Sequence, residues 1–266
     1  MLYSFKNKIV WITGASSGIG EALAYEFAHS GAKLILSSRR KDELYRVAKA
    51  CQKIGAESHV FTLDLADQVQ LESVADEVLS KFGHIDVLVN NGGISQRSLV
   101  AETPIDIDRK VMDIDFFSGV VLTKKVLPGM LQNKSGHIIV ISSITGVFGF
   151  PYRSAYSAAK HAINGFYETL WAELHEEGIN VTVACPGRVH TNVSLNAITK
   201  EGKAYGIMDH GQSGGITAEK CAKAILKSAL KRKVEVYIGR KELMMVYFKR
   251  YTPWLFYKLV SKVQPS

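Results

Sequence analysis

The chain has 266 residues, of which 47% are hydrophobic and 22% charged, a composition that excludes an intrinsically disordered protein. This length fits one large α/β domain or two small ones, with a full core in either case. The net charge of +8 is spread over predicted helices and the C-terminal stretch, without the interleaved basic and aromatic patch that binds nucleic-acid bases. We therefore expect no nucleic-acid partner.

The cysteines and the N-terminal residues indicate the cellular compartment of the protein. Cys51, Cys185 and Cys221 are odd in number and widely spaced, so they predict neither a disulfide framework nor a metal site. Residues 1–8 lead almost directly into a strand and lack the apolar stretch of a signal peptide or membrane anchor. We expect a cytoplasmic protein without a bound metal.

Short apolar runs rich in β-branched residues alternate along the chain with longer runs of helical periodicity. The predicted strands are 9–13, 33–37, 58–62, 87–90, 137–142, 181–184 and 234–238. The predicted helices are 20–29, 42–53, 68–82, 109–132, 155–176 and 218–231. This alternation predicts an α/β fold in a single domain, a doubly wound parallel sheet of about seven strands with helices on both faces. Ligands of such sheets bind beyond the carboxyl ends of the strands, where the strand order reverses.

A loop with the sequence Thr-Gly-Ala-Ser-Ser-Gly-Ile-Gly, residues 13–20, joins the first strand to the first helix. Glycines there permit a tight turn and close approach of the backbone to a pyrophosphate, whose charge is favoured at a helix N-terminus. Glycines at such a turn can also merely end the strand. Because this loop lies between the first strand and the first helix, we favour a dinucleotide site.

Residues at the end of the second strand indicate which nucleotide the site would bind. Arg39 and Arg40 stand there, about 20 residues beyond the loop, where an NAD site carries an acidic residue. Two guanidinium groups suit the 2′-phosphate of NADP(H) instead. As an alternative, they could be solvated charges paired with Asp42 and Glu43. We predict NADP(H) in preference to NAD(H).

Tyr156 and Lys160 are four positions apart, which places them on the same face of a predicted helix. A phenol ordinarily has a pKa of about 10 and is a poor base at neutral pH, and a nearby ammonium makes it more acidic. Taken alone, the pair could equally be an ordinary surface pair, so the surrounding motifs decide its meaning.

These motifs occur together in one known family. The chain resembles the short-chain dehydrogenase/reductases over nearly its whole length, through the loop 13–20, Asn-Asn-Gly-Gly at 90–93, Ser143, Tyr-Ser-Ala-Ala-Lys at 156–160 and Pro-Gly at 186–187. Segment 90–98 is similar to the branch named dehydrogenase/reductase member 7. The resemblance implies a Rossmann-type fold, an oxidoreductase that interconverts a carbonyl and a secondary alcohol, and a homodimer or homotetramer.

The resemblance also implies catalytic roles. Tyr156 would donate a proton to the carbonyl oxygen during reduction, or take one from the alcohol during oxidation. Lys160 would bind the nicotinamide ribose and make the tyrosine more acidic. Ser143 would polarise the substrate oxygen by a hydrogen bond, and we prefer it to Ser142 on its spacing from the tyrosine alone.

Cofactor contacts follow from the same resemblance. Asp64 would meet the adenine, Asn90 would secure the fourth strand beside the adenosine ribose, and Val189 and Thr191 would contact the nicotinamide carboxamide. Ordinary caps and turns are the alternative reading of these residues. The complete expected set is Gly14, Ser16, Ser17, Gly18, Ile19, Gly20, Arg39, Arg40, Asp64, Leu65, Asn90, Gly92, Tyr156, Lys160, Pro186, Gly187, Val189 and Thr191.

Asp115 departs from the family pattern, which usually has an asparagine at this position in a proton relay through water and the lysine. An ionised aspartate accepts hydrogen bonds and cannot donate them. A carboxylate close to Lys160 would raise the pKa of the lysine and weaken its effect on Tyr156. If the relay uses the backbone carbonyl, the change matters little. Our hypothesis is an active enzyme with an altered pH profile.

The substrate side is less determined by the sequence. Residues 190–215 form the expected substrate loop between the sixth strand and the next helix. Four residues could converge near the nicotinamide and favour an acidic or phosphorylated substrate, namely Arg97, Arg153, Arg188 and His190. We favour the alternative that their side chains are solvated.

We divide the chain into a nucleotide-binding domain, 1–239, and a basic and aromatic extension, 240–266. The extension could lie on a membrane surface or cover an apolar pocket, and we favour packing on the domain or a second subunit over contact with a membrane.

Two classes of function therefore compete. The first is an NADP(H)-dependent carbonyl reductase or alcohol dehydrogenase acting on an apolar or lipid-like small molecule. The second is an NADP(H)-binding scaffold or redox sensor with little turnover, which only Asp115 favours.

Overall fold

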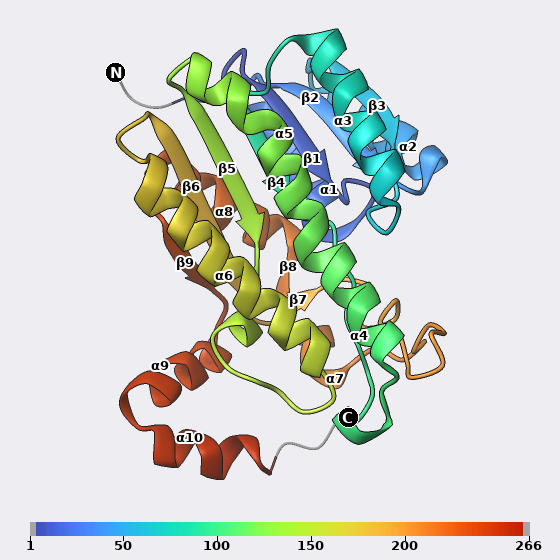
Figure 1. Cartoon of the computed structure of the whole chain (residues 1–266), viewed down its shortest axis with the longest axis vertical. Coiled ribbons are helices and arrows are strands. Elements are labelled where there is room, and N and C mark those ends of the chain that lie inside the picture. The colour runs from blue at the N-terminus through green and yellow to red at the C-terminus, as the bar shows by residue number, and fades with distance from the viewer. Residues whose placement is uncertain (1–3, 263–266) are drawn as a thin grey trace.

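The computed structural model describes residues 4–262, with the backbone alone at His210 and Gln212. Its centre is a seven-stranded sheet in the order β3-β2-β1-β4-β5-β6-β9, in which every neighbouring pair is parallel (Figure 1). These strands are β1 (Ile9–Thr13), β2 (Lys33–Ser38), β3 (Ser58–Thr62), β4 (Val87–Asn90), β5 (Gly136–Ile141), β6 (Ile179–Pro186) and β9 (Glu235–Ile238). The predicted doubly wound parallel fold is confirmed.

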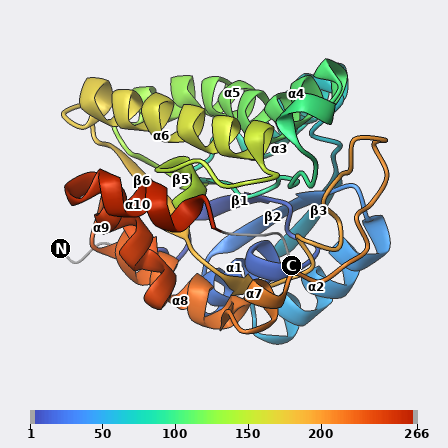
Figure 2. The same ribbon diagram turned by 90° about the horizontal axis from the view of Figure 1, so that it is seen from below.

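Helices cover both faces of this sheet, so the molecule has three layers (Figure 2). The helices are α1 (Gly18–His29), α2 (Lys41–Lys53), α3 (Gln68–Phe82), α4 (Ile105–Met112), α5 (Ser118–Gln132), α6 (Ser154–Leu174), α7 (His210–Ser213), α8 (Ala218–Leu230), α9 (Met244–Tyr251) and α10 (Pro253–Val260). One layer contains α1, α2 and α8, and the other contains α3, α5 and α6.

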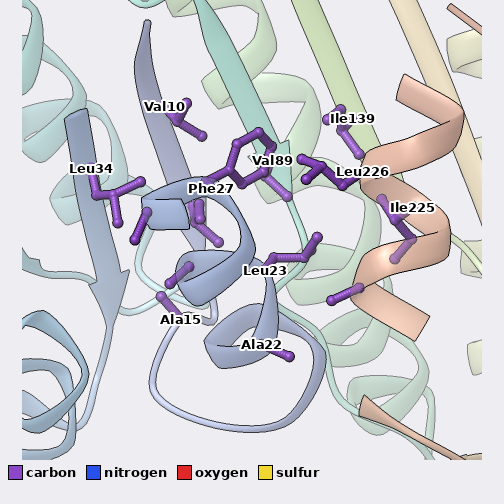
Figure 3. Packing of buried hydrophobic residues seen from close by; sticks show 14 of the residues in the cluster. Val10, Ala15, Ala22, Leu23, Phe27, Leu34, Val89, Ile139, Ile225 and Leu226 are labelled. Atoms are coloured by element: carbon purple, nitrogen blue, oxygen red, sulfur yellow. The ribbon is translucent and has the colours of Figure 1, made fainter. Parts of the chain in front are cut away.

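The core is divided by the sheet because alternate residues of a strand point to opposite faces. Val10 and Ile12 of β1 pack with Leu23 and Phe27 of α1 on one face, as Figure 3 shows for several of these side chains. Trp11 points to the opposite face and joins the cluster under α3, α5 and α6. Because both faces of these strands are buried, their sequences are continuous runs of apolar residues.

The predicted helix 109–132 is the one that the structure corrects. A helix begins earlier, at Ile105, and a π-helical turn at Asp113–Phe117 separates α4 from α5. The Ser118 hydroxyl donates to the carbonyl of Ile114, 2.6 Å away, within this irregular stretch. Apolar periodicity cannot reveal such a turn, because it inserts one residue without interrupting the helix.

Two further parts of the chain lie outside the seven-stranded sheet. The short strands β7 (Val189–His190) and β8 (Ile216–Thr217) pair in parallel and close the base of the segment between them. The extension forms α9 and α10 at the end of the molecule where the carboxyl ends of the strands lie (Figure 1). Within residues 4–262, no helix has the length and apolar character needed to cross a bilayer.

Phe27 is completely buried between α1 and the sheet. Truncating its side chain should therefore destabilise the fold strongly. We expect Phe27→Ala to lower the free energy of unfolding by about 3–5 kcal/mol, through lost burial and the cavity left behind. Urea denaturation measures this change. Val69→Ala at an exposed site of α3 is the control, with an expected change within about 0.5 kcal/mol. Equal effects of the two substitutions would contradict this account of the core.

Candidate active site

A cavity of about 510 Å³ lies at the carboxyl ends of the strands, on both sides of the point where the strand order reverses between β1 and β4. It is lined by sixteen of the eighteen residues expected around the cofactor, and also by Ser143 and Asp115. The sixteen are Gly14, Ser16, Ser17, Gly18, Ile19, Arg39, Arg40, Asp64, Leu65, Gly92, Tyr156, Lys160, Pro186, Gly187, Val189 and Thr191. Segments far apart in the sequence therefore meet at one site.

Gly20 and Asn90 do not line this cavity. The amide of Asn90 donates to the Tyr167 hydroxyl at 2.9 Å and to the Thr123 hydroxyl at 3.1 Å, so it ties β4 to α5 and α6. The next residue, Asn91, lines the cavity instead. Asn90 therefore secures β4 from behind the cavity, and its neighbour Asn91 is the residue that faces the cavity.

The loop between β1 and α1 leaves its backbone open to the cavity and forms a cradle there. Gly14 has a φ of +65°, and a Cβ there would lie 2.8 Å from the Asn91 amide nitrogen. That amide donates to the carbonyl of Thr13 at 3.0 Å. A side chain at Gly14 would therefore fill the cradle and strain the backbone, and the residues present fit a bound dinucleotide.

Arg40 reaches over this loop. Its guanidinium donates to the Ser16 hydroxyl at 3.0 Å and to the Ser17 hydroxyl at 2.7 Å. Glu43 accepts from Arg46 at 2.7 Å, and within residues 4–262 neither Arg39 nor Arg40 forms the alternative ion pair with Asp42 or Glu43. The cation and two hydroxyls thus form a cluster of donors at the end of β2.

Lys160 is buried in α6, and its ammonium has three neighbours. It donates to the carbonyl of Ile141 at 3.1 Å, lies 3.2 Å from an Asp115 carboxylate oxygen, and sits 5.4 Å from the centre of the Tyr156 ring. The sequence placed the tyrosine and lysine one turn apart on one face, and the structure shows both lining the cavity. The cation is therefore held between the tyrosine and the carboxylate.

Asp115 comes from the π-helical turn and is also buried. Its other carboxylate oxygen accepts from the backbone N–H of Ile94 at 2.7 Å. Burial raises the pKa of Asp115 although Lys160 acts against this. Burial alone would lower the pKa of Lys160. The charge and hydrogen bond of Asp115, together with the smaller effects of Tyr156 and Cys185, outweigh burial, so the pKa of Lys160 is raised and the ammonium keeps its proton.

The two serines after β5 differ in what they contact. The Ser142 hydroxyl donates to the Asn164 side chain at 2.6 Å, a link to α6. The Ser143 hydroxyl accepts from the backbone N–H of Thr145 at 3.2 Å and lies next to Tyr156 at the boundary of two cavities. This arrangement supports the preference for Ser143 as the residue that faces the substrate.

A second cavity, of about 540 Å³, shares Ser143, Tyr156, Gly187 and Val193 with the first. Its apolar wall includes Ile144, Phe148, Phe150, Met245 and Leu259, the last two from α9 and α10. The extension therefore contributes to an apolar cavity, as one of the possibilities drawn from the sequence has it, and α9 and α10 are the helices that supply the side chains.

Asp209 holds two of the arginines that we expected to be solvated, and that expectation is wrong for both. Arg97 is buried and forms an ion pair with Asp209, and Arg153 donates to the same carboxylate at 2.7 Å. Only Arg188 and His190 of the four residues are exposed. Local spacing cannot reveal the ion pair of Arg97, because Asp209 lies more than a hundred positions after it.

The sequence of this chain matches that of a known protein family. The chain matches the sequence model of the short chain dehydrogenases over residues 8–202.

The chain belongs to the short-chain dehydrogenase/reductase family.

Relatives and solved structures of this family agree with the fold. The mouse protein named dehydrogenase/reductase SDR family member 7B is 42% identical over 261 residues, which cover 96% of this chain and 81% of that protein. A short-chain dehydrogenase/reductase from Burkholderia phymatum, solved with NAD, is 23% identical with a TM-score of 0.83, and the match covers 99% of this chain and 98% of that one. An alcohol dehydrogenase from Thermococcus sibiricus, solved with 5-hydroxy-NADP, is 24% identical with a TM-score of 0.75, covering 89% and 97%. The predicted family and its member 7 branch are confirmed.

The buried pair predicts how Asp115→Asn changes the pH dependence of this oxidoreductase. Without the carboxylate, Lys160 loses the charge that raises its pKa, so it gives up its proton at lower pH. We expect the alkaline limb of the reduction pH-rate profile to move to lower pH. Asp113→Asn, on the exposed side of the same turn, is the control and should leave the limb in place. An Asp115→Asn profile that overlays the parent profile would refute the hypothesis.

Proposed function

We propose that this family member is an NADP(H)-dependent oxidoreductase that interconverts a carbonyl and a secondary alcohol, with Tyr156 as its acid and base. The single observation that carries the proposal is that Ser143 and Tyr156 border both cavities, with Lys160 behind the tyrosine ring. A hydroxyl, a phenol and an ammonium thus stand where a nucleotide cavity and a second cavity meet.

Each group has a defined task in this proposal. The loop after β1 holds the pyrophosphate, and Arg39 and Arg40 hold the 2′-phosphate that distinguishes NADP(H) from NAD(H). When bound, the nicotinamide supplies a hydride to the carbonyl carbon or accepts one from the alcohol. Ser143 donates a hydrogen bond to the substrate oxygen, and Tyr156 gives that oxygen its proton during reduction.

Lys160 supports Tyr156 through its charge. The protonated ammonium beside the ring stabilises the phenolate that forms once the proton has left. Asp115 lies 3.2 Å from the Lys160 ammonium and neutralises part of that field.

We also propose an apolar or lipid-like substrate. The second cavity has a wall of aliphatic and aromatic side chains, and the charges of Arg97 and Arg153 are partly neutralised by Asp209. A molecule with a large apolar part therefore fits this side better than a small polar carbonyl. The cytoplasmic location and the homodimer or homotetramer stay predictions from the sequence.

The first test is turnover by Tyr156→Phe. We measure NADPH oxidation by the purified chain with a panel of steroid, retinal, quinone and short aliphatic carbonyls. Loss of the proton donor should lower kcat by about 10²- to 10⁴-fold while leaving NADPH binding in place. Tight NADPH binding by the parent with no turnover of any carbonyl, or of any corresponding alcohol with NADP, would favour the scaffold or redox-sensor function instead.

The cofactor preference is tested separately with Arg40→Ala. Loss of a charged hydrogen-bond donor should weaken NADPH binding by about 10- to 150-fold and leave NADH binding nearly unchanged. Lys41→Ala removes an adjacent exposed cation that does not line the cavity, and serves as the control. Equal losses for the two nucleotides, or an equal effect of both substitutions, would count against a role of Arg40 at the 2′-phosphate. Isothermal titration of each nucleotide gives the numbers.

A further inference from the structure

Four aromatic side chains gather on the outer side of the C-terminal helices. Tyr247 and Tyr251 of α9 and Trp254 and Tyr257 of α10 are 54%, 71%, 70% and 58% exposed. We call these four residues the C-terminal aromatic patch. The two helices protrude at the end of the molecule that carries the site (Figures 1 and 2). Large side chains this exposed, close together on consecutive helices, indicate an interaction surface.

Packing of the extension on the domain does not require this patch. Val246 and Phe256, on the inner sides of the same helices, are buried in a cluster with Ile144 and Phe148. The rings of Phe148 and Phe256 meet edge to face at a centroid distance of 5.3 Å. The inner sides therefore already anchor both helices, and the outer aromatic rings are left over.

Positive charge accompanies the patch. Residues 244–266 contain Lys249, Arg250, Lys258 and Lys262 and no aspartate or glutamate. The Lys249 ammonium donates to the Tyr257 hydroxyl at 2.8 Å, while the other three cations are exposed. Any partner of this surface must therefore accept aromatic rings and neutralise several cations at once.

A second copy of the chain is a poor partner by this measure. In a dimer whose two-fold axis passes through this patch, these cations would face each other with no acidic residue of the segment between them. An anionic bilayer meets both requirements, because tyrosine and tryptophan favour the interfacial region and lysine and arginine bind acidic headgroups.

We propose that the C-terminal aromatic patch and its cations dock this protein on the surface of a membrane that contains anionic lipid. Met245 and Leu259 of the same two helices line the second cavity, so docking holds that cavity beside the lipid. This last link, the delivery of a lipid-like substrate, rests on the proposed function. The docking itself does not.

The test uses the full chain and vesicles of phosphatidylcholine, with or without phosphatidylserine, in a cosedimentation assay. Binding is expected only with phosphatidylserine, and it should weaken as salt is added. Arg250→Gln/Lys258→Gln should lower vesicle affinity about 30-fold, as follows from the contribution of two surface cations. Lys49→Gln/Lys53→Gln removes two exposed cations of α2 and should have little effect.

The aromatic contribution is measured in the same assay. Tyr251→Ser/Trp254→Ser should lower affinity at least tenfold, whereas Val69→Ser/Val100→Ser, a pair of exposed apolar residues elsewhere, should not. Equal binding to both kinds of vesicle, or patch variants that bind like their controls, would overturn the proposal. So would a dimer in analytical ultracentrifugation that Tyr251→Ser/Trp254→Ser dissociates.

Turnover of a water-soluble carbonyl separates this proposal from the proposed function. None of the eight substituted residues lines either cavity, so the four double variants should keep the parent rate without vesicles. Normal turnover without vesicle binding would refute the docking surface alone. Vesicle binding without turnover by the parent would support the docking surface and count against the reductase.

Discussion

The close approach of two chain segments between β1 and β4 is the constraint on which the site depends. The Thr13 hydroxyl at the end of β1 accepts from the backbone N–H groups of Asn91 and Gly92, each at 3.1 Å. The side-chain amide of Asn91 in turn donates a hydrogen bond to the backbone carbonyl of Thr13. Only small residues fit this contact, so Gly14 and Gly92 leave their backbones open to a ligand. The reversal of strand order at this place makes the contact, because it brings β4 beside β1 instead of β3.

A second constraint is the burial of Lys160, which needs compensation for its charge. Asp115 supplies it at 3.2 Å and also accepts from the backbone N–H of Ile94, so one carboxylate links α6, the π-helical turn and the segment after β4. Uncompensated charges in such an environment lose or gain a proton. The same pair that stabilises this corner of the fold therefore also sets the electrostatics of Tyr156.

Much of the fold could be predicted because buried parallel strands and amphipathic helices leave periodic patterns. Strands at 9–13, 58–62 and 87–90 and the helix at 68–82 have the bounds that the sequence predicts, and the motifs indicated most residues of the nucleotide cavity. Long-range polar contacts leave no such pattern. The bonds of Asn90 and the ion pairs of Asp209 depend on segments far apart in the chain, so neither could be deduced from local spacing.

The chemistry and the substrate side rest on different parts of the structure. Tyr156 and Lys160 are fixed by α6, which packs on the sheet, and Ser143 follows β5, a central strand of that sheet. The second cavity is completed by the segment between β7 and β8 and by α9 and α10, and Glu242 ties this extension to the end of β6 by accepting from the backbone N–H of Arg188 at 3.0 Å. Changes in the extension should therefore alter the substrate cavity while the nucleotide cradle stays in place.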